Sequence, residues 1–162
     1  MKKSSATVYL ICGFIGAGKT TFAKKLEQKT GAVRITKDEW LISLFGHDPT
    51  IEHFEMYDNT ICRLANDIAF EFIKRGVDVI IDDGFWIRKQ RDEMREKIKH
   101  VGGKVILYYL PTPMEAMKKR VVNRNQRLSK DSFEISEVLF EKYQQYWEPP
   151  QADEEFILAE LV

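Results

Sequence analysis

Hydrophobic residues occur along this chain in two alternating patterns. One pattern is a short continuous run, rich in β-branched and aromatic residues and followed by glycine, proline or charged positions. Such runs are typical of strands buried on both faces of a sheet. We therefore predict five strands, at residues 7–12, 32–36, 77–82, 104–110 and 155–162.

The second pattern places apolar residues three or four positions apart, which is the spacing of an amphipathic helix. The longest example runs from Ile51 to Arg75 and ends at Gly76. Further helices are predicted around residues 22–30, 36–45, 94–101, 112–121 and 131–147.

Capping residues predict where three of these helices begin. Thr36 and Glu39 have the spacing of a capping box, and Thr112 precedes a proline that suits the first turn. Asp131 and Glu134 are expected to open the last helix by the same chemistry.

Strands that alternate with helices predict a parallel sheet with helices on both faces, because a parallel neighbour requires a long crossover. The expected fold class is α/β, as a three-layer sandwich. A chain of 162 residues is close to the usual size of one domain, so residues 1–162 are expected to form a single domain.

Charge and apolar length limit the partners of this chain. Its 25 Lys and Arg residues balance its 25 Asp and Glu residues, so no overall field attracts nucleic acid or a membrane surface. A local basic groove for nucleic acid is neither indicated nor excluded by this balance. No apolar run approaches the ~20 residues that span a bilayer, so we expect no membrane partner.

Cys12 and Cys62 lie in apolar surroundings without CxxC spacing, so they are expected to be reduced core thiols. This favours a cytoplasmic location. The basic and then apolar start of the chain imitates a secretory signal, but cleavage there would destroy the glycine-rich segment that comes next.

That glycine-rich segment, GFIGAGKT at residues 13–20, satisfies GxxxxGK(S/T) between a predicted strand and a predicted helix. This is the context of a phosphate-binding P-loop, in which glycines let backbone amides face the phosphates. Lys19 is expected to reach the terminal phosphates, and Thr20 to bind Mg²⁺. The predicted nucleotide-binding residues of the loop are Gly13, Gly16, Ala17, Gly18, Lys19, Thr20 and Thr21.

Five segments, in this order, resemble the small P-loop kinases of the polynucleotide-kinase, zeta-toxin and chloramphenicol-phosphotransferase group. Many members of the group are known only as AAA-domain predicted kinases. The resemblance implies a five-stranded sheet of order 2-3-1-4-5, an ATP site at the P-loop and an arginine-bearing lid near residues 113–130. The segments are GFIGAGKTT, ITKDEW, VIIDDGFWIRKQR, MKKRVVNRNQR and WEPPQADEE.

Three aspartates are candidates for the chemistry of such a kinase. Asp38 matches the aspartate that accepts the proton of the acceptor hydroxyl. Alternatively, a carboxylate in a first helical turn can serve only to interact favourably with the helix dipole. Asp82 aligns as the acid near Mg²⁺ or the acceptor, while Asp83 could instead cap the following turn. Leu41 and Ile42 occupy the region where family members often carry an arginine, which weakens the case for a phosphorylated or nucleic-acid acceptor.

Arginines are the candidates for the lid. Arg120, Arg124 and Arg127 have spacings that place them on one helical face, which suits either solvent or a transferring phosphoryl group. Arg120 and Arg124 match the lid pair of the family, so they are predicted to be catalytic and nucleotide-binding. Arg88 and Arg91 could line the acceptor pocket or only contact solvent at a helix start.

The resemblance implies an ATP-dependent kinase that uses Mg²⁺ and acts on a hydroxyl of a small-molecule or nucleotide-like acceptor. Lys19, Asp38, Arg120 and Arg124 would be catalytic, and Thr20 and Asp82 would serve the metal. No NKxD guanine signature occurs, which favours ATP over GTP. Two alternatives stay open: an ATP-binding switch or accessory ATPase, and a 5′-hydroxyl polynucleotide kinase.

Overall fold

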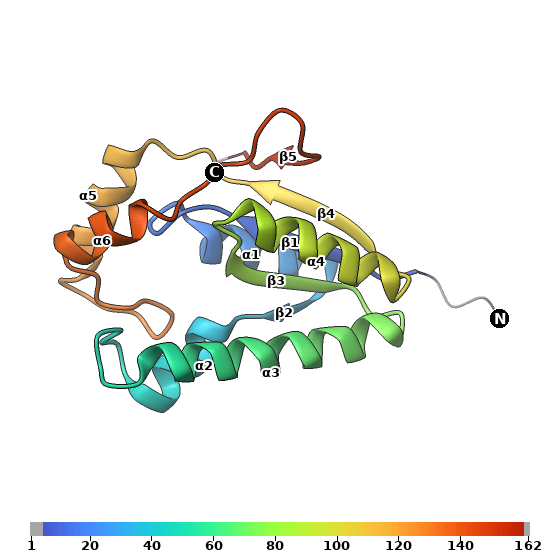
Figure 1. The fold of residues 1–162 in the computed structure, drawn as a ribbon, viewed down its shortest axis with the longest axis horizontal. Helices are drawn as coiled ribbons and strands as arrows, with labels where there is room; N and C mark the ends of the chain where they lie inside the picture. Colours follow the sequence, from blue (N-terminus) through green and yellow to red (C-terminus); the bar gives the residue numbers. More distant parts are fainter. Residues whose placement is uncertain (1–4, 161–162) are drawn as a thin grey trace.

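A five-stranded parallel sheet lies at the centre of the computed structural model, which describes residues 5–160 (Figure 1). Its strand order is β2-β3-β1-β4-β5, with every neighbouring pair parallel. The predicted fold class and sheet order are therefore confirmed. The strands are β1 (Thr7–Cys12), β2 (Val33–Ile35), β3 (Val79–Gly84), β4 (Lys104–Tyr109) and β5 (Ile157–Leu158).

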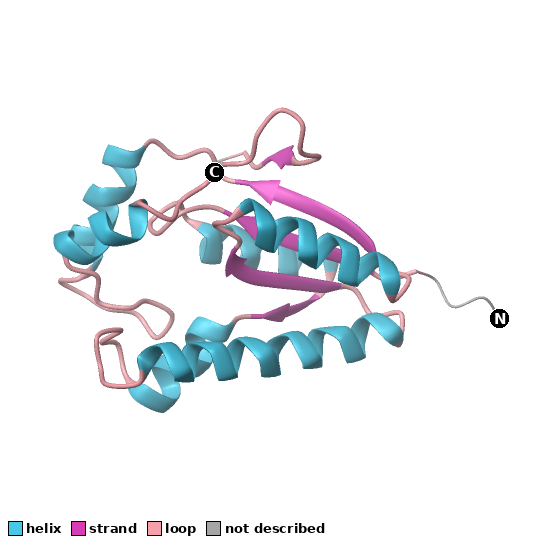
Figure 2. Cartoon of the chain, viewed as in Figure 1, coloured by secondary structure: helices cyan, strands magenta, loops and turns pink. Residues whose placement is uncertain are grey.

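Helices cover both faces of this sheet, as Figure 2 shows. On β3, Val79 and Ile81 pack with α3 and α4, whereas Ile80 packs with α1, α5 and α6, because successive strand residues face opposite sides. Among residues 5–160, no helix has the length and apolar content of a membrane span. The helices are α1 (Lys19–Thr30), α2 (Lys37–Phe45), α3 (Phe54–Lys74), α4 (Arg88–His100), α5 (Met114–Arg124) and α6 (Glu137–Gln144).

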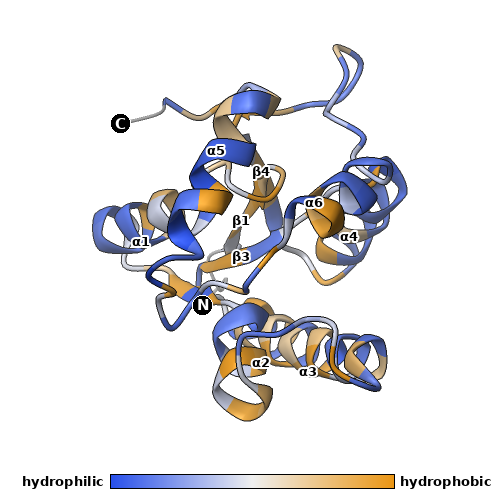
Figure 3. Cartoon of the chain, turned by 90° about the vertical axis from the view of Figure 1, so that its left-hand side faces the viewer, coloured by the Kyte–Doolittle hydropathy of each residue, from blue (hydrophilic) through white to orange (hydrophobic). Residues whose placement is uncertain are grey.

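Hydropathy follows the three layers. Figure 3 shows apolar strands among helices, of which α1 and α5 are mainly hydrophilic whereas α2 carries a hydrophobic stretch. The strands β1 and β3 supply some of the most buried side chains, including Val8, Leu10 and Ile80 at 0% exposure. This core holds the carboxyl ends of the strands in place, and those ends are where parallel sheets bind ligands.

Helix α6 begins later than predicted. It starts at Glu137, where the Ser136 hydroxyl accepts a hydrogen bond from the Leu139 amide at 3.2 Å. Asp131 does not open this helix, because its carboxylate pairs with Lys24 of α1 instead. The predicted start at Asp131 was wrong, and residues 125–136 form a connecting segment between α5 and α6.

The other predicted caps also differ from the structure. Thr36 occupies the N-cap position of α2, but its side chain makes no capping hydrogen bond, and Glu39 pairs with Arg34 at 3.1 Å. The Thr112 hydroxyl donates to the Ala17 carbonyl at 3.2 Å, so it fastens the P-loop and does not cap α5. Helix α3 begins at Phe54, three residues after the predicted start.

The fifth predicted strand is largely irregular. Within the described part of residues 155–162, only Ile157–Leu158 forms a strand, and residues 161–162 lie outside the described range. The segment is anchored through Glu154, which pairs with the fully buried Arg91 in two bonds of 2.7 Å. Arg88 binds Asp153 in the same way, at 3.1 and 2.8 Å. Arg88 and Arg91 therefore fasten this segment to α4 and line no acceptor pocket.

Candidate active site

The P-loop connects β1 to α1, and its backbone requires glycine. Gly16 and Gly18 have φ angles of 82° and 95°, a region that favours glycine. A Cβ at Gly16 would also lie 2.6 Å from the Met117 carbonyl oxygen of α5. The loop ends at the first turn of α1, whose amides have no helical acceptor and carry partial positive charge. This is a phosphate-binding geometry.

A cleft of about 620 Å³ opens beside the loop, at the carboxyl edge of the sheet. Most of the predicted site residues line it: Gly16, Gly18, Lys19, Thr20, Thr21, Asp38, Arg120 and Arg124. Three predicted site residues, Gly13, Ala17 and Asp82, are buried and lie outside the lining, and the first two shape the loop from behind.

Lys19 is the charged centre of the loop. Its Nζ donates to the Phe14 carbonyl oxygen at 3.0 Å. Burial lowers the pKa of Lys19, while Asp82 and Asp38 act in the opposite direction. The structure thus brings together a P-loop lysine and two of the three candidate acids.

Asp82 and Asp83 point to opposite faces of β3. Asp82 faces the P-loop, is 4% exposed and has its Oδ2 buried without a hydrogen-bond partner. Burial raises the pKa of Asp82 to about 6, although Lys19 opposes the rise. An unpaired buried carboxylate oxygen beside the Thr20 hydroxyl suits Mg²⁺, which takes few protein ligands and completes its shell with phosphates and water. Residues 5–160 contain no cluster of three or more His, Cys, Asp or Glu residues that could hold a metal alone.

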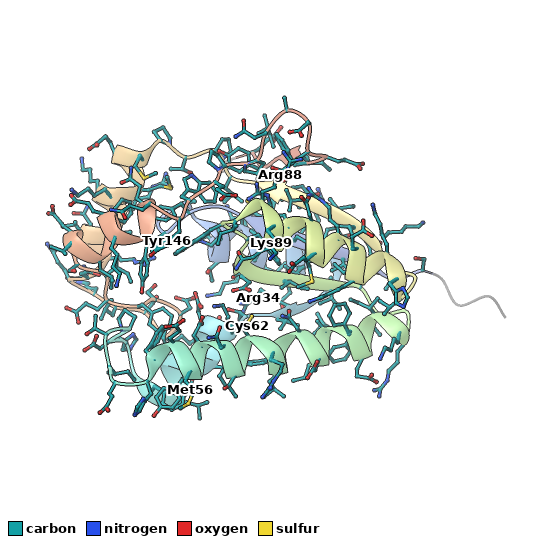
Figure 4. The ribbon with its side chains drawn as sticks, viewed as in Figure 1. Arg34, Met56, Cys62, Arg88, Lys89 and Tyr146 are labelled. Carbon is teal, nitrogen blue, oxygen red and sulfur yellow. The ribbon has the colours of Figure 1, made fainter. Side chains whose placement is uncertain are left out.

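Asp83 faces the other way, toward α3. It forms an ion pair with Lys37 at 3.1 Å, and Lys37 also binds Asp58 of α3 at 2.6 Å. Burial acts to lower the Lys37 pKa, but the carboxylates around it, led by Asp83, hold it well above its ordinary value. The Cys62 thiol donates weakly to Asp83 at 3.7 Å, and Figure 4 shows Cys62 on the side of α3 that faces the sheet. Cys62 therefore lines the cleft and is not a core thiol, whereas Cys12 is buried as predicted.

Asp38 lies in the first turn of α2, where both Lys19 and Lys37 act on its carboxyl group. Burial raises the pKa of its carboxyl group, Lys37 and Lys19 lower it, and Asp83 raises it further. A carboxylate with a raised pKa at the surface of a cleft is a candidate proton acceptor.

Helix α5 presents two of the three predicted arginines to the cleft. The Arg120 guanidinium donates to the Gly16 carbonyl at 3.3 Å. Arg124 is partly buried, its Nε has no partner, and burial lowers its pKa. Arg127 lies beyond the end of α5 and is exposed, so the three arginines do not share one helical face.

The segment 125–136 runs from α5 toward the loop before α3 (Figure 1), and several of its residues between 129 and 135 line the cleft. On one side, Asp131 pairs with Lys24. On the other side, His47 Nδ1 donates to the Ser132 carbonyl at 2.8 Å, and the Glu134 amide donates to the His47 carbonyl at 2.9 Å. Sequence reasoning could not find this role of His47, because its contacts are with a segment 85 residues away.

Aromatic residues also line the cleft, and Trp86 among them packs against Phe14 of the P-loop with ring centroids 5.0 Å apart. Trp86 and Tyr143 lie with ring centroids 5.7 Å apart, and Phe54 meets Phe133 edge to face at 5.5 Å. Phe54 and Tyr143 belong to helices that the hydrophobic spacing predicted, and both line the cleft. Lys37 and Asp58 were missed entirely.

The cleft divides into two halves. One half, which we name the nucleotide half for the role proposed below, comprises Gly16 and residues 18–21 with Arg120 and Arg124. The other half, which we name the acceptor half for its proposed role, comprises the cleft-lining residues of α2, α3 and the end of β3 with its following turn, chiefly Lys37, Asp38, Asp58, Asp83 and Trp86. The two halves meet at Lys19 and Asp38.

Known proteins with similar sequences include three kinases. The chain is 23% identical over 149 residues to a guanylate kinase of Legionella pneumophila, covering 76% of this chain and 66% of the relative. It is 24% identical to an L-seryl-tRNA(Sec) kinase of Methanococcus maripaludis, covering 83% and 51%. It is 26% identical to a shikimate kinase of Caldicellulosiruptor bescii, covering 80% and 73%. The chain thus spans about two thirds or less of the first two relatives.

Solved structures share the fold. A protein from Chloroflexus aurantiacus superposes with a TM-score of 0.74 over 96% of this chain and 84% of its own, at 14% identity. Together these similarities confirm the resemblance to small P-loop kinases. Residues 8–150 match the AAA domain family, and the chain belongs to that family.

Proposed function

We propose that this protein is an ATP-dependent phosphotransferase that phosphorylates a hydroxyl group of a small-molecule or nucleotide-like acceptor. The observation that carries the proposal is the meeting of a P-loop lysine, Lys19, with a cleft carboxylate, Asp38. The kinases among its relatives support the reaction class and leave the acceptor open.

The nucleotide half would bind Mg²⁺ and ATP. Backbone amides at residues 16–21 and the Lys19 ammonium suit the phosphates, and the oxygens of Thr20 and Asp82 suit the metal. When bound, Mg²⁺ neutralises phosphate charge. The unpaired Oδ2 of Asp82 supports this assignment over Asp83, whose carboxylate is engaged by Lys37.

Asp38 would orient the acceptor hydroxyl and accept its proton. Phosphoryl transfer depends mainly on positioning and charge neutralisation, and it needs a carboxylate in reach of the nucleophile. Burial makes Asp38 a stronger base than an exposed aspartate, because it raises the carboxyl pKa.

Arg120 and Arg124 would neutralise charge on the transferring group, and we propose residues 113–130 as the lid that carries them within one domain of residues 1–162. The unpartnered Nε of Arg124 supports this role, because a buried guanidinium nitrogen without an acceptor suits an anionic ligand. We further propose a cytoplasmic location, in keeping with the two free cysteines.

The test is ADP formation from Mg·ATP in the presence of an acceptor panel of nucleosides, sugars, aminocyclitols and 5′-hydroxyl oligonucleotides. Lys25→Ala is a matched control for Lys19→Ala, because Lys25 is exposed on the same helix outside the cleft. We expect acceptor-dependent ADP formation in the wild type and in Lys25→Ala, and none in Lys19→Ala. Slow hydrolysis that no acceptor accelerates would favour the switch or accessory ATPase instead.

A further inference from the structure

The acceptor half of the cleft carries an excess of negative charge. Among the described lining residues of α2, α3 and the end of β3, Lys37 is the single cation, beside three aspartates: Asp38, Asp58 and Asp83. The region where an arginine could have joined Lys37 is filled by Leu41 and Ile42, both buried.

Lys37 is already engaged. Its ammonium binds Asp58 Oδ1 at 2.6 Å and Asp83 Oδ1 at 3.1 Å. Two carboxylates therefore hold one ammonium, and Asp38 adds a third carboxylate to this half of the cleft. An incoming anion would compete with two bound carboxylates for Lys37 and would meet repulsion from Asp38.

The same carboxylates keep capacity for donors. The Asp58 side chain is 32% exposed and the Asp83 side chain 22% exposed, and each uses one oxygen for Lys37. A carboxylate oxygen accepts hydrogen bonds from hydroxyl groups, and more strongly from ammonium groups.

The wall beside these acids is aromatic. Trp86 and Tyr143 lie near each other, and Phe54 and Phe133 close the side next to Asp58. Aromatic faces pack against the apolar face of a ring and attract nearby cations. Carboxylates and aromatic faces together suit a ring with many hydroxyl donors and positive charge.

We propose that the acceptor is a hydroxyl-rich ring compound that carries at least one ammonium group, of the aminocyclitol or aminosugar class. The inference rests on the proposed kinase function and specifies its acceptor. In the reaction, one acceptor hydroxyl oxygen bonds to the γ-phosphorus of ATP, the bond from that phosphorus to the β,γ-bridging oxygen breaks, and ADP leaves. The hydroxyl proton passes to Asp38, while the ammonium group binds Asp58 or Asp83.

The test compares three cyclohexane polyols that differ in charge: 2-deoxystreptamine, myo-inositol and quinate. Each is titrated calorimetrically into the protein loaded with Mg²⁺ and a non-hydrolysable ATP analogue. The ammonium-bearing probe is expected to bind at least about tenfold more tightly than inositol, with quinate weakest. Equal affinities, tightest binding by quinate, or no saturable binding of 2-deoxystreptamine up to about 10 mM would each overturn the proposal.

A charge-removing variant separates recognition from folding. Asp58→Asn should weaken 2-deoxystreptamine about tenfold and change inositol little, because it removes charge and keeps shape. Asp67→Asn is the matched control, since Asp67 is exposed on the same helix outside the cleft. An unchanged preference for the ammonium probe in Asp58→Asn would contradict the assignment to this carboxylate cluster.

Titration of the ATP analogue alone distinguishes failure of the acceptor proposal from failure of the proposed kinase function. If the analogue binds and the binding is lost in Lys19→Ala, the nucleotide site stands whatever the polyols do. A 5′-hydroxyl oligonucleotide that binds more tightly than all three polyols would overturn the aminocyclitol class and favour a polynucleotide kinase.

Discussion

The two halves of the cleft are built in opposite ways. The nucleotide half offers backbone amides and cations, and most of it comes from one continuous stretch, the loop after β1 and the first turn of α1. The acceptor half uses carboxylates and aromatic rings from α2, α3 and the turn after β3. Phosphate recognition needs one local backbone shape, whereas recognition of a particular acceptor needs side chains brought together by the whole fold.

Removing the lysine of the nucleotide half should have the largest effect. Lys19→Ala is expected to lower turnover by about 10³-fold or more, because the ammonium neutralises the terminal phosphates during transfer. ATP binding should also weaken, and the melting temperature should not fall, since the Lys19 ammonium is buried at a cost. Turnover equal to that of Lys25→Ala would refute the P-loop assignment.

Replacing Asp38, which lies where the two halves meet, should lower turnover without changing nucleotide affinity. Asp38→Asn keeps size but loses basicity, so kcat should fall about 10²-fold while the Kd of the ATP analogue stays constant. In the wild type, the rate should fall with acid at a higher pH than an exposed aspartate would give, because the Asp38 pKa is raised by burial. Normal turnover of Asp38→Asn together with a lower melting temperature would show that Asp38 has a structural role instead.

Arg124 should affect the rate more than nucleotide affinity. Its guanidinium is partly buried without a partner for Nε, so Arg124→Ala should lower kcat by about 10- to 100-fold and raise the ATP Kd less. Lysine should restore little, because it lacks the planar fork. Arg127→Ala, at an exposed position, should change neither quantity. Equal losses in rate and affinity for Arg124→Ala would indicate an ordinary ground-state contact.

A change outside both halves should alter stability and leave transfer almost unchanged. Hydrogen bonds from Arg91 lower the pKa of Glu154 to about 2, so this carboxylate stabilises the fold above about pH 4.5 and loses that contribution as pH falls toward 2. Glu154→Gln should therefore reduce the unfolding free energy by up to about 3 kcal/mol near neutral pH and by less near pH 3. Urea unfolding at the two pH values measures this. A loss of unfolding free energy in Glu154→Gln that is larger at pH 3 than near neutral pH would contradict a stabilising pair between Arg91 and Glu154.

The sequence predicted the fold and the nucleotide half of the cleft better than it predicted the acceptor half. The strand order came from the family resemblance, and the strand and helix pattern from hydrophobic spacing. The P-loop was predicted residue by residue, since one local motif carries it. Lys37, Asp58 and Trp86 were not predicted, because their contacts join segments far apart in the chain. One signal was available: Phe54, Asp58 and Cys62 recur every four residues, and a carboxylate within an apolar stripe indicates a face that is not core.

Cap predictions failed for a related reason. Thr112 and Asp131 have side chains that can cap helices, but each binds a residue elsewhere in the fold. Thr112 donates to the Ala17 carbonyl, and Asp131 pairs with Lys24. Local propensity gives way when a side chain gains a partner elsewhere in the fold.

The most direct test of transfer between the two halves is to measure ADP and phosphorylated acceptor in the same reaction, with Mg·[γ-³²P]ATP and the acceptor panel. We predict one labelled acceptor molecule for each ADP in the wild type, with both products about 10²-fold lower in Asp38→Asn, although that variant still binds the ATP analogue normally. ADP without labelled acceptor, at a rate that Asp38→Asn leaves unchanged, would contradict transfer between the two halves of the cleft.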